Sequence, residues 1–96
     1  MGIADVVSKK RGDILRIAAK HGVQRIRVFG SVARGDAGPQ SDVDFLVDVG
    51  PHHSPFFPGG LVVDLEALLG RRVDVVEPDS LYAPLRTTVL KEAVPL

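Results

Sequence analysis

Two aspartates separated by one residue open an apolar stretch of the chain, in the run SDVD at residues 41–44. Side chains two positions apart on a strand share one face, with their Cα atoms roughly 6.5–7 Å apart. Asp42 and Asp44 could therefore converge on metal ions about 3.5–4 Å apart, the separation used in two-metal phosphoryl transfer. Because aspartate is disfavoured in strands, the pair calls for a compensating role. Taken alone, it is explained equally well as a cap for the turn after Pro39.

A third aspartate, Asp74, interrupts the apolar run VDVV at residues 73–76. A neighbouring strand lies about 4.8 Å away, so Asp74 could sit beside Asp42 and Asp44. Three close carboxylates repel one another unless a cation compensates them. Because all the donors are oxygen atoms, this set favours Mg²⁺ or Mn²⁺ over zinc.

The dipeptide Gly30–Ser31 follows a predicted strand and opens a predicted short helix that ends near Gly35. Glycine allows close approach of the backbone to a ligand, and serine can cap a helix start. Such a junction directs free N–H groups and the positive end of the helix dipole at an anion, so it suits a phosphate. Alone, a Gly-Ser turn is more often only a turn. Neither the GxxxxGK[ST] phosphate loop nor the GxGxxG dinucleotide motif occurs in the sequence.

The run GSVARG at residues 30–35, followed after five residues by SDVD at 41–44, resembles the G-S-x-x-R-G…S-D-x-D signature of DNA-polymerase-β-like nucleotidyltransferases. Asp74 completes that pattern as the third acid. The segments LEALLGRRVDVV (65–76) and LRTTVLKEAVPL (85–96) are similar to those of the minimal nucleotidyltransferase antitoxins, so the resemblance covers nearly the whole chain. The residues with the identity that the family motif requires are Gly30, Ser31, Arg34, Gly35, Asp42, Asp44 and Asp74.

The resemblance implies a polymerase-β-like nucleotidyltransferase core of the α/β (α+β) class, a small mixed sheet with helices packed on it. It also implies a partner, a HEPN-domain toxin, in a hetero-oligomer. The implied reaction is transfer of AMP from ATP to a tyrosine of that toxin, which silences its ribonuclease activity. Two Mg²⁺ ions are the implied cofactors.

The resemblance also assigns roles. Gly30 and Ser31 would hold the β- and γ-phosphates, and Asp42 and Asp44 would bridge Mg²⁺ to the triphosphate. Asp74 would complete the second metal site and help deprotonate the acceptor hydroxyl.

Two further residues are candidate nucleotide ligands, Arg34 and Ser41. Arg34 could pair with a phosphate, although a structural salt bridge to a nearby aspartate explains it at least as well.

The rest of the chain must supply the sheet that positions these residues. Apolar residues near a 3.6-residue period predict a helix over residues 3–21, which could break or kink at Gly12. Residues 25–29 alternate charged and apolar side chains and predict a strand, as does the stretch 43–49. In the second strand Val43, Phe45 and Val47 point away from the aspartates and would face the core.

The second half of the chain continues this alternation. It predicts a helix over 61–69, a strand over 71–76 and a helix over 79–93 that is capped by Asp79 or Ser80. Tyr82, the only tyrosine, is expected to pack at the start of that helix. The α-β-α-β-α-β-α order predicts one domain over residues 1–96.

Residues 51–60 (PHHSPFFPGG) predict a loop. Its adjacent His52 and His53 more often face solvent than bind a metal. Phe56 and Phe57 could cap the pocket, touch the base or dock a partner, but packing over the sheet edge explains them better.

Composition narrows the class of protein. The 96 residues are 45% hydrophobic and 25% charged, as in ordinary soluble domains. The absence of cysteine excludes disulfides and thiolate zinc sites. With no leader and no apolar stretch near the ~20 residues that span a bilayer, we expect a cytoplasmic protein without a membrane partner. The zero net charge argues against direct binding of nucleic acid.

The charges are unevenly distributed. Residues 1–35 carry eight Lys/Arg against two Asp, a balance of +6, whereas residues 36–96 carry four against ten, a balance of −6. Folding could intermix them on one solvated surface. Alternatively, a basic N-terminal face for an acidic partner lies beside an acidic, metal-binding pocket. The first helix and the Phe56/Phe57 loop are the candidate docking surfaces.

Two other functions are open. One is a non-catalytic antitoxin that acts by binding alone, which the three aspartates disfavour because unneeded carboxylates cost stability. The other is a nucleotidyltransferase of a small hydroxylated molecule such as an aminoglycoside. The 96 residues disfavour it because they leave no second domain for an acceptor pocket.

Overall fold

Helices and strands alternate along the chain, as the sequence pattern predicts. The computed structural model describes residues 2–53, 55 and 57–96. Its elements are α1 (Ile3–Lys9), α2 (Arg11–Lys20), β1 (Val23–Phe29), α3 (Gly30–Arg34), β2 (Val43–Val49), α4 (Gly59–Leu69), β3 (Val73–Val76), the 3₁₀ helix η1 (Pro78–Ser80), α5 (Ala83–Glu92) and β4 (Val94–Pro95).

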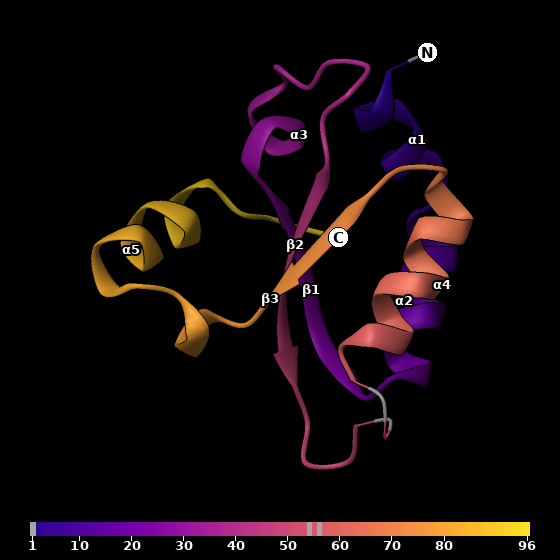
Figure 1. Cartoon of the computed structure of the whole chain (residues 1–96), viewed down its shortest axis with the longest axis vertical. Helices are drawn as coiled ribbons and strands as arrows, with labels where there is room; N and C mark the ends of the chain where they lie inside the picture. Colours follow the sequence, from indigo (N-terminus) through magenta and orange to yellow (C-terminus); the bar gives the residue numbers. More distant parts are fainter. Residues whose placement is uncertain (1, 54, 56) are drawn as a thin grey trace.

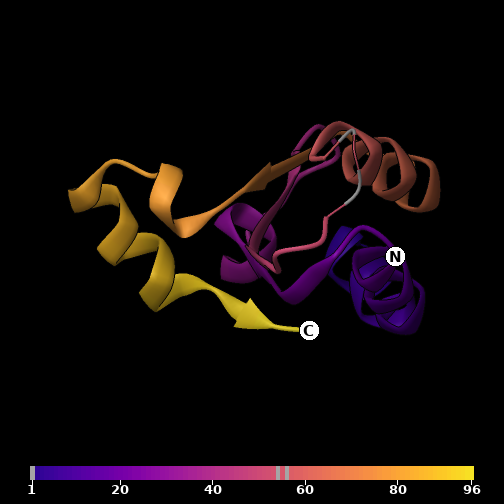
Figure 2. The same cartoon turned by 90° about the horizontal axis from the view of Figure 1, so that it is seen from below.

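The strands form one mixed sheet in the order β3-β2-β1-β4. Strands β2 and β3 are parallel, and β1 runs antiparallel to both β2 and β4. Helices α2 and α4 lie together on one side of the sheet, which we call the helical face, while η1 and α5 stand on the other side (Figures 1 and 2). This is the predicted fold class, a small mixed sheet with helices packed on it.

The core lies on the helical face, between the sheet and helices α2 and α4. Val43, Phe45 and Val47 of β2 have no exposed surface, and neither do Ile14 of α2 and Leu61 of α4. Each fully buried side chain of this size contributes about 1.5–3 kcal/mol relative to an exposed one. The alternation of β2 therefore fixes which side of the strand faces the helices.

The predicted first helix is bent at Lys10 and not at Gly12. Lys10 has ψ 14°, so α1 ends before it and α2 begins after it. Helical hydrogen bonding continues across this residue, because its N–H bonds the Val6 carbonyl and its own carbonyl accepts from Ile14. The two short helices are therefore one bent helix.

The C-terminal segment differs more from the prediction. The last helix begins at Ala83, where Pro84 favours the first turn, so Asp79 and Ser80 do not cap it. The predicted packing role of Tyr82 is wrong, because 76% of this residue is exposed. Strand β4 was not expected, since its two residues form a strand only by pairing with Arg27 and Val28 of β1.

The described helices include none with the length and apolar character that crossing a bilayer requires.

Candidate active site

Asp44 and Asp74 are paired positions on the neighbouring parallel strands β2 and β3. Val43 and Phe45 on either side of Asp44 are buried against the helical face. Because successive side chains of a strand point to opposite faces, Asp44 lies on the other face of the sheet, and Asp74 does so beside it. We call this side, which also carries Asp48, the acidic face. The structure thus brings together the two aspartates that the spacing predicts to be neighbours.

Asp42 lies just before β2 at the same end of the sheet. Its side chain is 48% exposed, and its Oδ1 atom is 3.4 Å from Nε of Arg72. In the part of the chain that the structure describes, no three histidines or acidic residues already converge as a metal-binding group. Asp42 would have to turn away from Arg72 to join Asp44 and Asp74 around an ion.

Arg71 holds the loop that precedes Asp42. Its Nη1 donates to the carbonyl oxygens of Gly38 at 3.2 Å and Ser41 at 2.9 Å. The Ser41 hydroxyl accepts a hydrogen bond from the Gly38 N–H at 2.8 Å, which closes the loop. Ser41 therefore has a structural task, and its role as a nucleotide ligand stays a prediction.

The carboxylates affect one another electrostatically. The pKa of Asp44 is raised by burial first, then by the negative charges of Asp74 and Asp42, with Glu92 adding to them and Arg34 opposing them. A bound cation would reverse the repulsion among these acids. An all-oxygen donor set under like-charge repulsion fits a hard divalent ion such as Mg²⁺.

Gly30 makes room for Asp44. Its φ is +73°, and a Cβ atom added at this position would lie 2.2 Å from Oδ2 of Asp44. The sequence suggested that this glycine lets a phosphate approach, but the structure gives it a second reason. Ser31 follows it as a partly buried residue in the first turn of α3. The phosphate-binding roles of Gly30 and Ser31 stay predictions.

Arg34 forms the structural ion pairs that were one of its two explanations. Its Nη1 donates to Glu92 at 2.6 Å and its Nε to Asp36 at 3.2 Å. The pKa of Arg34 is raised by the hydrogen bond to Glu92 and then by the bond to Asp36. Its pairing with a phosphate stays a prediction.

Glu92 is the acidic residue near the site that sequence reasoning missed. It lies at the end of α5, and its carboxylate reaches α3 through Arg34. The contact joins residues 58 positions apart, and no local pattern marks it. An acid in the last helix turn carries no signal of its own, whereas the paired aspartates break an apolar run.

The loop after β2 lies far from Asp44, beyond the other end of that seven-residue strand. A Cβ atom at Gly22 would lie 2.4 Å from the His52 carbonyl oxygen, so the loop packs against the end of α2. Phe57 packs on the core and its ring centroid lies 5.4 Å from that of His53. Phe57 therefore has a packing role, and its predicted place over the sheet edge stays a prediction. Phe56 lies outside the described residues.

Comparisons with known proteins relate the chain to nucleotidyltransferases. The nucleotidyltransferase domain family matches residues 11–96. A protein adenylyltransferase, MntA of Thermococcus cleftensis, is 48% identical over 75 residues, which are 78% of this chain and 76% of the relative. A solved structure described as a candidate minimal nucleotidyltransferase is 43% identical, with a TM-score of 0.85 over 97% of this chain and 95% of its own. The toxin–antitoxin complex MntA–HepT matches in fold, at 20% identity and a TM-score of 0.67, over 92% of this chain and 69% of that one.

Proposed function

The chain belongs to the nucleotidyltransferase domain family, and on this premise we propose that it is an antitoxin that modifies its toxin. It transfers AMP from ATP to a tyrosine hydroxyl of a cognate HEPN-domain ribonuclease, in the cytoplasm, with residues 1–96 acting as one domain. The observation that carries the proposal is the pairing of Asp44 with Asp74 next to the Gly30 turn. The similarity to a protein adenylyltransferase and the fold shared with a toxin–antitoxin complex support it.

The residues of the site divide the work. Gly30 and Ser31, at the start of α3, bind the β- and γ-phosphates of ATP. Asp42, Asp44 and Asp74 would hold Mg²⁺, which when bound neutralises charge on the triphosphate and favours ionisation of the acceptor hydroxyl. Arg34 holds Glu92 and so limits the negative charge near Asp44.

The reaction forms one bond and breaks one. The tyrosine oxygen attacks the α-phosphorus, and the bond from this phosphorus to the β-phosphate bridging oxygen breaks as pyrophosphate leaves with the electron pair. A free tyrosine has a pKa of about 10, so its proton must be accepted as attack begins. Asp74 is exposed at the edge of the acidic face and can accept that proton from a hydroxyl arriving from outside.

Mass spectrometry of the partner toxin tests the proposal. After incubation with this chain, ATP and Mg²⁺, the toxin should gain the mass of one or more adenylyl groups, and fragmentation should locate them on tyrosine. A toxin with that tyrosine changed to phenylalanine is the matched control and should stay unmodified.

Two results would replace the proposal. If the toxin stays unmodified while its ribonuclease activity is inhibited stoichiometrically, the chain acts by binding alone. If an aminoglycoside such as kanamycin is adenylylated in place of the toxin, the chain is a small-molecule transferase.

A further inference from the structure

The edge of the sheet at β1 is only partly covered. Strand β4 pairs with Arg27 and Val28, and the Leu96 N–H reaches the Ile26 carbonyl at 3.2 Å. No strand of the described residues pairs with the outer edge of β1 before Ile26. An uncovered strand edge offers backbone N–H and C=O groups to an added strand.

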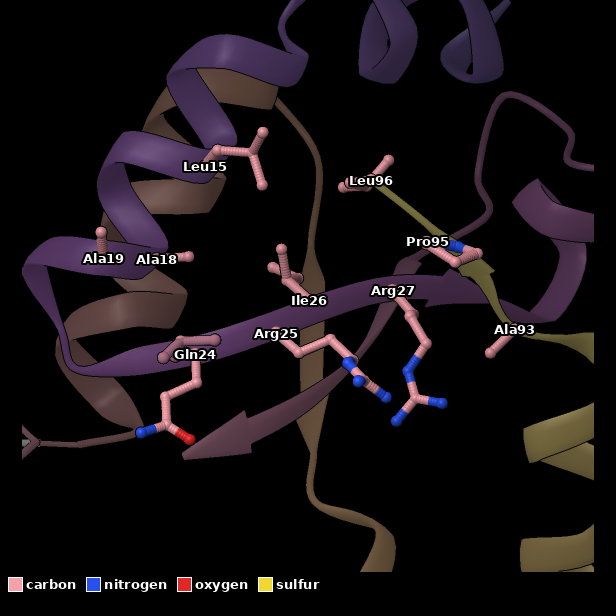
Figure 3. Close-up of a pocket in the computed structure, with 11 residues that line it drawn as sticks. Leu15, Ala18, Ala19, Gln24, Arg25, Ile26, Arg27, Ala93, Pro95 and Leu96 are labelled. Carbon is pink, nitrogen blue, oxygen red and sulfur yellow. The ribbon is translucent and has the colours of Figure 1, made fainter. Parts of the chain in front are cut away.

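A groove of about 550 Å³ lies along this edge, between α2 and the C-terminal residues (Figure 3). We call it the β1-edge groove. Its volume lies within the usual range for ligand sites. It is on the opposite edge of the sheet from β3, which carries Asp74. The groove is therefore a separate feature from the acidic site, and an inference about it does not depend on the proposed transferase activity.

The two sides of the β1-edge groove differ chemically. Leu15 and Ala18 of α2 lie with Ile26 and Leu96 on one side of the β1 ribbon, while Arg25 and Arg27 extend to the other side (Figure 3). This division follows from the alternation of β1, in which Ile26 faces the core and its arginine neighbours do not. A strand added here would alternate in the same way, with one side against apolar atoms and the other against guanidinium groups.

The positive charges of Arg25 and Arg27 are only partly balanced within the described residues. Arg27 is 14% exposed in its side chain, and its Nε is buried without a hydrogen-bond partner within the described residues. Asp48 is the acidic partner of both arginines, at 3.4 Å from Arg27 and 3.8 Å from Arg25. One carboxylate therefore faces two guanidinium groups and cannot neutralise both positive charges. An added carboxylate would balance the second positive charge by pairing with Arg25, whose side chain is 66% exposed.

The positive charge beside the β1-edge groove favours some binding partners over others. A second copy of this chain, pairing by the same free edge, would bring its own Arg25 near the Arg25 of the first copy, and like charges opposite each other are destabilising. An extended segment that alternates acidic and apolar side chains meets both sides of the groove. The basic balance of residues 1–35, of which only Arg34 acts near Asp44, agrees with an acidic partner.

We propose that the β1-edge groove binds an extended acidic–apolar segment of a partner protein, with a carboxylate paired to Arg25 and apolar side chains against α2. The segment lies alongside β1, in line with β4, and extends the sheet.

Fluorescence anisotropy with a labelled synthetic peptide of alternating valine and glutamate tests this site. The matched probe alternates valine and lysine. The wild-type chain should bind the glutamate peptide at least about tenfold more tightly than the lysine peptide, because a charge-assisted hydrogen bond forms only with the glutamate peptide. Arg25→Glu should reverse this preference. Arg16→Glu makes the same charge change at an exposed position of α2 and should leave the peptide preference unchanged.

A second variant tests the shape of the groove without changing its charge. Ala19 is exposed and lines the groove, so Ala19→Trp should fill it and abolish peptide binding without touching either arginine. Equal binding of both peptides, or full binding by Ala19→Trp, would overturn the proposal. So would Ala19-dependent self-association in sedimentation experiments, which would identify a second copy as the occupant.

Discussion

The two faces of the sheet are built by the same strands and are filled in opposite ways. On the helical face, Val43, Phe45 and Val47 exclude water completely and hold the domain together. On the acidic face, Asp44 is partly buried beside Asp74, and its pKa is raised because burial and neighbouring charges oppose its ionisation. The acidic face also buries one apolar side chain, Leu46, but at Asp44 it gives up stability to hold a carboxylate. Stability and chemistry should therefore be separable, residue by residue, along β2.

Replacing both Asp42 and Asp44 by Asn should have the largest effect on chemistry. A bound metal supplies several kcal/mol of transition-state stabilisation, so we expect adenylyl transfer to fall by a factor on the order of a thousand. The midpoint of urea unfolding should stay the same or rise, because carboxylate repulsion is relieved. Asp48→Asn changes the same face of the same strand and should keep transfer activity. Full activity of the double variant with Mg²⁺ would refute the assigned roles.

Phe45→Ala, next to Asp44, should have the largest effect on stability. Deleting a fully buried phenylalanine costs about 3–5 kcal/mol, a large part of the stability of a small domain. Urea unfolding monitored by circular dichroism measures this loss. Val63→Ala removes an exposed apolar side chain and should change the free energy of unfolding by less than about 0.5 kcal/mol. Similar losses in the two variants would mean that the helical face does not hold the core.

Gly30→Ala should reduce both the stability of the domain and its transfer activity. Gly35→Ala is the matched control. Both glycines have positive φ, +73° and +81°, so alanine costs about 1–2 kcal/mol of backbone strain at either position. At Gly30 the methyl group would also strike the Asp44 carboxylate, whereas at Gly35 it meets no atom within 4 Å. Only Gly30→Ala should therefore also reduce transfer and ATP affinity, as measured by calorimetry. Equal activity of the two variants would show that the position of Asp44 is unimportant.

The sequence predicts what depends on alternation within one strand. It predicts the bounds of β2, its buried side and the neighbouring positions of Asp44 and Asp74, because a period of two assigns each residue to a face. It does not predict what depends on contacts between distant segments. Strand β4 and the Arg34–Glu92 ion pair both arise from the return of the C-terminal segment to the sheet. The roles given to the site residues come from the resemblance and stay predictions.

The smallest predicted effect is a difference in pH dependence between two aspartates on opposite faces. Asp44→Asn and Asp64→Asn should change stability with opposite signs in magnesium-free buffer. Asp44 has a raised pKa, whereas the pKa of Asp64 on α4 is lowered, first by its hydrogen bond to His21 and then by its bond to Lys20. The folded state therefore favours the neutral form of the first carboxyl group and the ionised form of the second.

The sign follows from these directions. The contribution of Asp44 is fully present below its unfolded pKa and is lost as pH rises through the raised folded pKa, so at neutral pH its charge is a burden that Asp44→Asn removes. The contribution of Asp64 is present above its unfolded pKa and is lost as pH falls through the lowered folded pKa. At neutral pH, Asp44→Asn should therefore melt above the wild type and Asp64→Asn below it. Both differences should shrink in acid, and Mg²⁺ should raise the melting temperature of the wild type but not that of Asp44→Asn. Thermal melts followed by circular dichroism from neutral to acidic pH measure all of these changes, and shifts of the same sign in the two variants would contradict the assigned environments.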